Sequence, residues 1–134
     1  MNWIARPLIF LSLAAFLLIP SAGTFAAERA WDELDLQATL LFRDQKYDEA
    51  LPVAEQALRV AETKYGPKSP QRLVSMNFLA YLSRKTGDYG RARTLYGEVL
   101  GLLEKVYGPD DPRTAAARQR YESVVSLAKD EAPR

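Results

Sequence analysis

The 134-residue sequence contains neither cysteine nor histidine. Without cysteine the chain has no disulfide, no thiolate metal site, no cysteine nucleophile and no N-terminal cysteine for a lipid. Without histidine it lacks the commonest general base and neutral metal ligand. The acidic residues near expected helix N-termini, among them Asp35 and Asp111, are explained by the helix dipole. We therefore expect no enzyme, no metal and no cofactor.

An excess of charge of one sign is also lacking, because 18 basic side chains face 17 acidic ones. A nucleic-acid-binding domain needs a basic surface, and docking on anionic lipid needs a basic cluster. The balanced charge therefore argues against both kinds of partner.

The first 26 residues have the three-part layout of a secretory signal. Arg6 supplies a positive start, residues 7–20 carry no charge, and Thr24 and Ala26 are small residues placed for a cut before Ala27. An uncleaved membrane anchor is the alternative, but the apolar core is shorter than the roughly 20 residues of a span. We expect residues 27–134 to form one exported domain without membrane insertion. Export without cysteine favours a bacterial periplasm or secretion.

A repeat with a period of 42 residues runs through the rest of the chain, since residues 46–70 return as residues 88–112. The two copies pair Tyr47 with Tyr89, Ala50 with Ala92, Leu58 with Leu100, Gly66 with Gly108 and Pro70 with Pro112. A fixed period in this range indicates one supersecondary unit stacked on the next.

Glycine and proline separate five stretches of helical spacing. The expected helices cover residues 29–43, 48–64, 71–85, 90–106 and 113–129. Gly66 and Gly108 are placed for left-handed helix ends, and Ser69 and Asp111 are placed as N-caps before a proline. The predicted fold is all-α: helical hairpins in about two repeats, followed by a C-terminal capping helix.

Leu79, Ala80, Gly87, Tyr89 and Ala92 carry a resemblance to the tetratricopeptide repeat family, in particular to the 42-residue repeats of kinesin light chains. The preceding copy keeps Ala50, Ala54 and Ala57 but has Gln45 where a glycine is usual. The resemblance spans roughly residues 30–129. It implies a right-handed solenoid in which the first helix of each hairpin lines a concave peptide-binding groove.

Carried over by position, the resemblance implies a set of groove residues: Asp35, Thr39, Phe42, Arg43, Asn77, Tyr81, Arg84, Lys85, Gln119 and Ser123. Asn77 would bond the backbone of a bound peptide, and Tyr81 would add an aromatic contact. The basic residues at one end would receive an acidic segment or a C-terminal carboxylate. Ordinary surface and packing roles are the alternative for each of these side chains.

Two further features have alternative explanations. Gly97 and Gly101 lie four residues apart inside an expected helix, which indicates either a close contact with another helix or tolerated substitutions on an outer face. Arg118, Arg120 and Glu122 suit a solvent-facing cap.

The expected function is that of an exported interaction module that binds a peptide or protein, as an adaptor or assembly factor in the cell envelope. A self-associating, oligomeric scaffold is the alternative.

Overall fold

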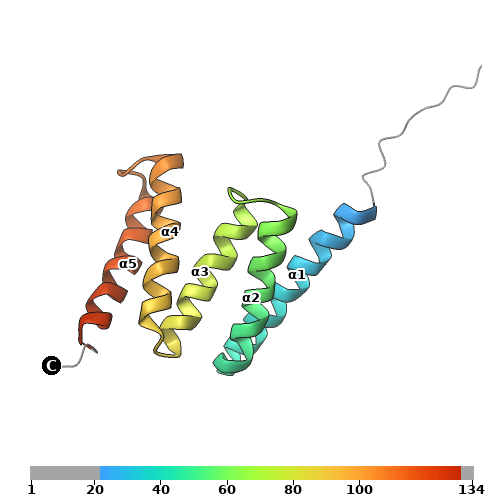
Figure 1. Ribbon diagram of the computed structural model, residues 1–134, viewed down its shortest axis with the longest axis horizontal. Coiled ribbons are helices and arrows are strands. Elements are labelled where there is room, and N and C mark those ends of the chain that lie inside the picture. The colour runs from blue at the N-terminus through green and yellow to red at the C-terminus, as the bar shows by residue number, and fades with distance from the viewer. Residues whose placement is uncertain (1–21, 131–134) are drawn as a thin grey trace, which may run out of the picture.

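The computed structural model describes the backbone of residues 22–130 and the side chains of residues 30–130. This part forms five helices: α1 (Ala22–Arg43), α2 (Tyr47–Lys64), α3 (Pro70–Lys85), α4 (Tyr89–Tyr107) and α5 (Pro112–Asp130). They stand side by side in chain order, each running opposite to its neighbour (Figure 1). The all-α prediction is confirmed, and α2 to α5 each begin one residue before the expected start.

The predicted signal segment lies largely outside the described residues, so its cleavage stays a prediction. Helix α1 begins at Ala22, within the last part of that segment. No helix of the described chain combines the length and the apolar character needed to cross a membrane.

The turns between helices follow the chemistry of the sequence. Gly66, Gly87 and Gly108 have φ of 87°, 86° and 86°, so the two glycines predicted to end helices, Gly66 and Gly108, both adopt the positive φ that favours glycine. Gln45 occupies the position that Gly87 has in the next repeat, and it takes φ of 60° without being glycine. The turn geometry of the repeat is therefore kept even where its usual residue is missing.

Polar side chains cap the starts of α3 and α5. The hydroxyl of Ser69 accepts a hydrogen bond from the Arg72 backbone N–H at 3.2 Å. The Asp111 carboxylate accepts one from the Arg113 backbone N–H at 2.9 Å. Both caps predicted from the sequence are thus present, each followed by a proline at the start of its helix.

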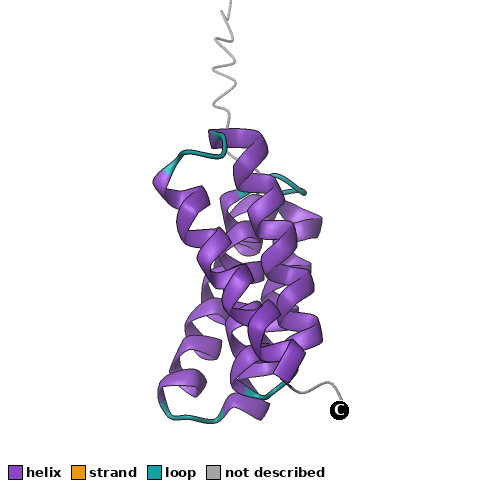
Figure 2. Cartoon of the chain, turned by 90° about the vertical axis from the view of Figure 1, so that its left-hand side faces the viewer, coloured by secondary structure: helices purple, strands orange, loops and turns teal. Residues whose placement is uncertain are grey.

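Small side chains let the helices approach closely. Ala38 of α1 and Ala50, Ala54, Ala57 and Ala61 of α2 are at most 2% exposed. Each helix packs against the next, and α1 also contacts α3, so consecutive hairpins stack as in a solenoid. Figure 2 views this stack from its end, with the connecting turns at the top and bottom.

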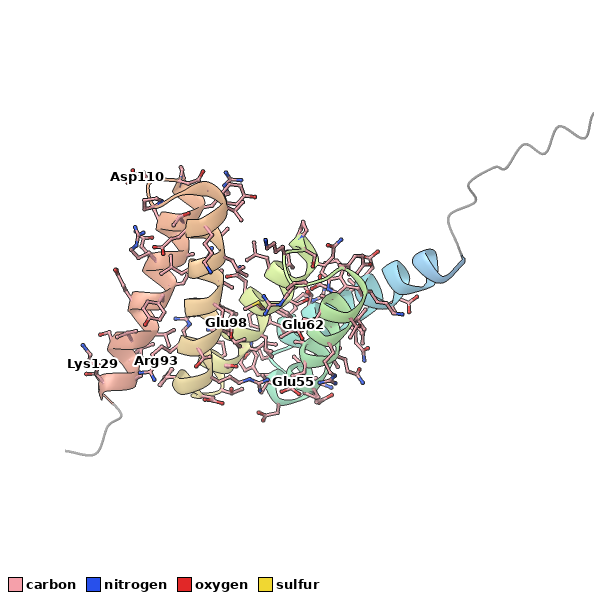
Figure 3. All side chains as sticks on the ribbon, turned by 45° about the horizontal axis from the view of Figure 1, so that its top comes forward. Glu55, Glu62, Arg93, Glu98, Asp110 and Lys129 are labelled. Atoms are coloured by element: carbon pink, nitrogen blue, oxygen red, sulfur yellow. The ribbon has the colours of Figure 1, made fainter. Side chains whose placement is uncertain are left out.

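Ion pairs join the second helices of the hairpins to their neighbours. Arg72 of α3 pairs with Glu62 of α2 at 3.1 Å and with Glu98 of α4 at 3.3 Å. Figure 3 labels the two glutamates on their separate helices. Arg118 pairs with Glu104 at 2.9 Å, so this partly exposed residue of the expected cap also links α5 to α4.

Gly97 and Gly101 have different surroundings. A Cβ on Gly97 would lie 3.3 Å from the Tyr121 ring of α5, whereas a Cβ on Gly101 would meet nothing within 4 Å. Gly97 is thus explained by close contact with another helix of the same chain. Gly101 fits the outer-face explanation.

Candidate functional site

Two adjoining hollows lie between α3, α4 and α5. The first, of about 270 Å³, is lined by Tyr81, Arg84, Tyr96, Gln119, Arg120 and Ser123. The second, of about 490 Å³, is lined by Val74, Asn77, Phe78, Tyr81, Tyr96 and Arg120. Because they share three residues, the two hollows form one continuous depression, here named the α3–α5 groove.

Helical spacing places one row of α3 residues along this groove. Val74, Phe78 and Tyr81 follow one another at intervals of four and three residues, which keeps them on one helix face. Helix α5 supplies the opposite wall with Arg120 and its neighbours. Tyr96 of α4 is 3% exposed and forms the floor.

Asn77 has one amide atom satisfied and one unsatisfied. Its Nδ2 donates a hydrogen bond to the Leu73 carbonyl at 3.2 Å, one turn earlier in α3. This bond fixes the amide orientation, because a flipped amide would set two oxygens against each other. Its Oδ1 is buried and has no hydrogen-bond partner among the described residues. Asn77 lines the second hollow, but this acceptor is covered in the present conformation, so a ligand donor could reach it only after the side chain turned.

Tyr81 joins the packing of α1 to the groove surface. Its ring lies 5.3 Å from the ring of Phe42, centre to centre. The guanidinium carbon of Arg84 lies 5.1 Å from the Tyr81 ring centre, and the Lys85 amine lies 5.6 Å from it. Tyr81 thus acts both as a packing residue and as the support of a cationic end of the groove.

The buried phenol of Tyr96 shows the electrostatic character of the groove. Burial raises the pKa of Tyr96, and the positive charges of Arg84 and Arg120 act in the opposite direction. Two guanidinium groups from different helices therefore act on the same buried hydroxyl.

A family model described as tetratricopeptide repeat matches residues 33–105, which is more than half of the chain. The chain belongs to the tetratricopeptide repeat family. No curated protein matches the sequence. Tetratricopeptide repeats generally serve protein interaction and not catalysis. The finer likeness to kinesin light chains stays a prediction.

The tetratricopeptide repeat brings half of the predicted groove residues together. Those that border the α3–α5 groove are Asn77, Tyr81, Arg84, Gln119 and Ser123. Phe42 lies behind Tyr81 as a packing partner. Asp35, Thr39, Arg43 and Lys85 line neither hollow of this groove.

The four residues outside the groove have surroundings of their own. Arg43 pairs with Asp44 at 3.7 Å. Burial, followed by the charge of Asp32, raises the pKa of Asp35. Lys85 borders a separate hollow at the turn between α1 and α2, and Thr39 is exposed.

Four groove residues were not predicted from the sequence: Val74, Phe78, Tyr96 and Arg120. Val74 and Phe78 share the helix face of Tyr81, so helical spacing from that residue identifies them. Tyr96 lies within the second copy of the 42-residue repeat, but its place on the floor depends on how α4 packs between α3 and α5. Arg120 was interpreted as part of a solvent-facing cap; it is exposed and also lines the groove.

Within the described residues, no three acidic side chains gather as they would around a metal ion.

Proposed function

We propose that this tetratricopeptide repeat protein holds an unfolded segment of a partner protein in the α3–α5 groove and acts as an adaptor or assembly factor. The main support is that Asn77 and Tyr81 line the same hollow, and that the Oδ1 of Asn77 has no partner among the described residues and would become available if the side chain turned toward the groove. A backbone N–H of a bound peptide matches this acceptor. The protein would perform no chemistry and need no cofactor.

The stacked helices favour this mode of binding. The groove walls belong to helices that pack on buried residues such as Val99 and Val124, both 0% exposed. A groove that is formed in advance leaves the ordering of the partner segment as the main entropic cost. Affinity then depends on how well a few side chains are recognised.

The place of action we propose is the periplasm or the cell exterior. The support is the signal-like layout of the first 26 residues together with the absence of cysteine. N-terminal sequencing of the protein from its source cells tests the proposal. A chain that starts at Ala27 supports export with cleavage, whereas a chain that starts at Met1 contradicts cleavage and favours the uncleaved anchor.

A crosslinking pull-down from cell-envelope extract tests the groove. The parent protein is compared with a double variant, Asn77→Ala and Tyr81→Ala. A control double variant, Gln56→Ala and Tyr107→Ala, removes the same two chemical groups from exposed positions outside the groove. A species captured by the parent and the control but not by the groove variant supports the proposal. Equal capture by all three contradicts it.

Self-association is the second candidate function. Leu36 and Leu40 of α1 are 59% and 40% exposed and lie one turn apart at the free end of the stack. Two copies that joined these faces would form a structural scaffold. The molar mass in solution decides: a monomer contradicts this candidate, and a dimer that a Leu36→Ser, Leu40→Ser variant dissociates supports it.

A further inference from the structure

Another hollow lies at one edge of the stack, away from the α3–α5 groove. It has a volume of about 250 Å³ and lies between the start of α3 and the end of α4. The α2–α3 and α4–α5 turns are at this same edge (Figure 1). This space, here named the edge hollow, shares no lining residue with the groove. A ligand in the edge hollow would therefore leave the groove free.

The edge hollow is mostly apolar. Its apolar lining residues are Pro70, Leu73, Leu102, Leu103, Val106 and Tyr107. Val106 is 63% exposed and Tyr107 is 45% exposed. Exposed apolar side chains that gather around a hollow mark a ligand or partner site, whereas single scattered ones do not.

The two remaining lining residues are lysines. Lys68 comes from the α2–α3 turn and Lys105 from α4, and both are exposed. Neither forms an ion pair with a side chain that the structure describes. Glu98, which borders a neighbouring hollow with Lys105, pairs with Arg72 at 3.3 Å. Two ammonium groups from different elements therefore stand beside an apolar hollow without a neutralising acid, which favours a ligand with an apolar body and an anionic head.

The first copy of the repeat has different residues at the corresponding positions. Trp31 stands 42 residues before Leu73, and Lys64 stands 42 residues before Val106. The Trp31 side chain reaches α3, where its Nε1 donates a hydrogen bond to the Ser75 hydroxyl at 2.9 Å. The smaller residue at position 73 and the exposed valine at position 106 belong to the second copy alone, so the packing of the repeat does not require them.

The size and the lining of the edge hollow favour an aliphatic chain over a peptide. A water molecule in the liquid occupies about 30 Å³, so the hollow holds about eight groups of that size, and a methylene group is similar in size. A peptide backbone that entered the hollow would lose its hydrogen bonds to water and find few partners among aliphatic side chains, whereas an alkyl chain needs none.

We propose that the edge hollow binds a small amphiphilic anion, with an alkyl chain of up to about eight carbons between α3 and α4 and the anionic head at Lys68 and Lys105. The head stays at the mouth of the hollow, because a charge taken into the apolar part would lose its hydration. This inference does not rest on the proposed function, since the two sites share no residue.

Titration of the whole chain with sodium octanoate tests the inference, followed by the methyl signals of Leu103 and Val106 in ¹³C NMR. Butanoate keeps the carboxylate and shortens the chain, and octyltrimethylammonium keeps the chain and reverses the charge. The acetylated, amidated peptide Ser-Glu-Leu-Glu-Ser represents a partner segment with an apolar side chain between two acids.

We expect saturable shifts with octanoate at a Kd of about 1 mM or tighter, as for other ligands of this size. Butanoate should bind at least tenfold more weakly, because it buries fewer methylene groups, and octyltrimethylammonium should also bind at least tenfold more weakly. Equal binding of the two octyl probes overturns the inference, as does the absence of shifts at about 5 mM octanoate, several times the expected Kd. Tighter binding of the peptide than of octanoate also overturns it and assigns the hollow to a protein partner.

Substitutions locate the binding site. Leu73→Trp introduces the residue of the first copy and should fill the hollow, so octanoate binding should fall at least tenfold while circular dichroism shows an unchanged fold. The double variant Lys68→Gln, Lys105→Gln changes only exposed side chains and should weaken binding at least fivefold. The control double variant Lys64→Gln, Lys129→Gln removes two exposed lysines that do not line the hollow and should alter binding less than twofold. Equal losses in the two double variants overturn the inference.

Discussion

Asn77→Ala should make the protein more stable while it removes partner binding. The Asn77 side chain is half-buried, and its Oδ1 has no partner among the described residues. A buried acceptor without a hydrogen bond costs about 1–3 kcal/mol. Alanine also has a higher helix propensity than asparagine by about 0.6 kcal/mol. Both terms favour the variant.

The loss of one hydrogen bond opposes this gain. The hydrogen bond from Asn77 Nδ2 to the Leu73 carbonyl contributes about 0.5–1.5 kcal/mol to stability. Leu73 lies within α3, where the helical hydrogen bonds also use its carbonyl, so the substitution does not leave that oxygen unsatisfied. The net expectation is a gain of about 1 kcal/mol in the free energy of unfolding. For a domain of this size, 1 kcal/mol raises Tm by roughly 4 °C. Thermal and urea unfolding followed by circular dichroism measure both quantities.

Thr114→Val is the matched control for this prediction. The Thr114 hydroxyl is the other buried group without a hydrogen-bond partner in the described part of the chain, and Thr114 lies outside the groove. Valine keeps its shape and removes the hydroxyl, so we expect a similar gain in stability with partner capture unchanged. An Asn77→Ala variant that loses about 1 kcal/mol or more would refute the reasoning, because Asn77 would then be a structural residue.

Three further predictions concern the turns and the glycines. Gln45→Gly should raise the free energy of unfolding, measured in urea, by about 0.5–1 kcal/mol. The left-handed conformation costs a non-glycine residue about 1–2 kcal/mol, and the larger entropy that glycine loses on folding cancels about 0.5–1 kcal/mol of this gain. No gain would contradict this prediction. Gly101→Ala should raise stability by about 1 kcal/mol, and Gly97→Ala should gain clearly less because of the Tyr121 contact at 3.3 Å; equal melting shifts would refute the packing argument. Hydrogen bonds from Arg113 lower the pKa of Asp111 to about 2, so its contribution to stability is complete above its ordinary pKa of 3.8 and is lost as the pH falls through about 2. Carboxyl NMR should find that midpoint and its return toward 3.8 in Arg113→Gln, whereas an unchanged midpoint would contradict the assignment.

The fold could be predicted because its information is local and repeated. Turn residues such as Gly66 and caps such as Ser69 act within a few residues of chain, and the 42-residue period shows that their order recurs. The exception is Gln45, because glutamine does not predict a left-handed turn. Its conformation follows from the packing of the two helices on either side of it. The sequence indicates this turn only by comparison with Gly87, which stands at the same position in the second copy.

The groove could be predicted only in part. The sequence indicates which residues share one face of a helix, but not which residues of a neighbouring helix lie opposite that face. The α3 positions Asn77 and Tyr81 followed from the resemblance and from helical spacing. Tyr96 and Arg120 come from two other helices, and their meeting at one hollow depends on the angle at which α4 and α5 pack. A repeat register gives the position of each residue in its unit, but it does not give the shape of the space between units.

The same packing explains why the groove belongs to the second repeat and to α5. Phe42 lies 5.4 Å from the Tyr47 ring and 5.8 Å from the Phe78 ring, so aromatic side chains fill the corresponding region between α1 and α3. The open hollows begin beyond this cluster and need the wall that α5 supplies. Helix α5 also buries Ala117 and Val124 against α4, at 1% and 0% exposure. A half repeat that looks like a cap in the sequence therefore both closes the core and builds the binding surface, so its loss would remove stability and recognition together.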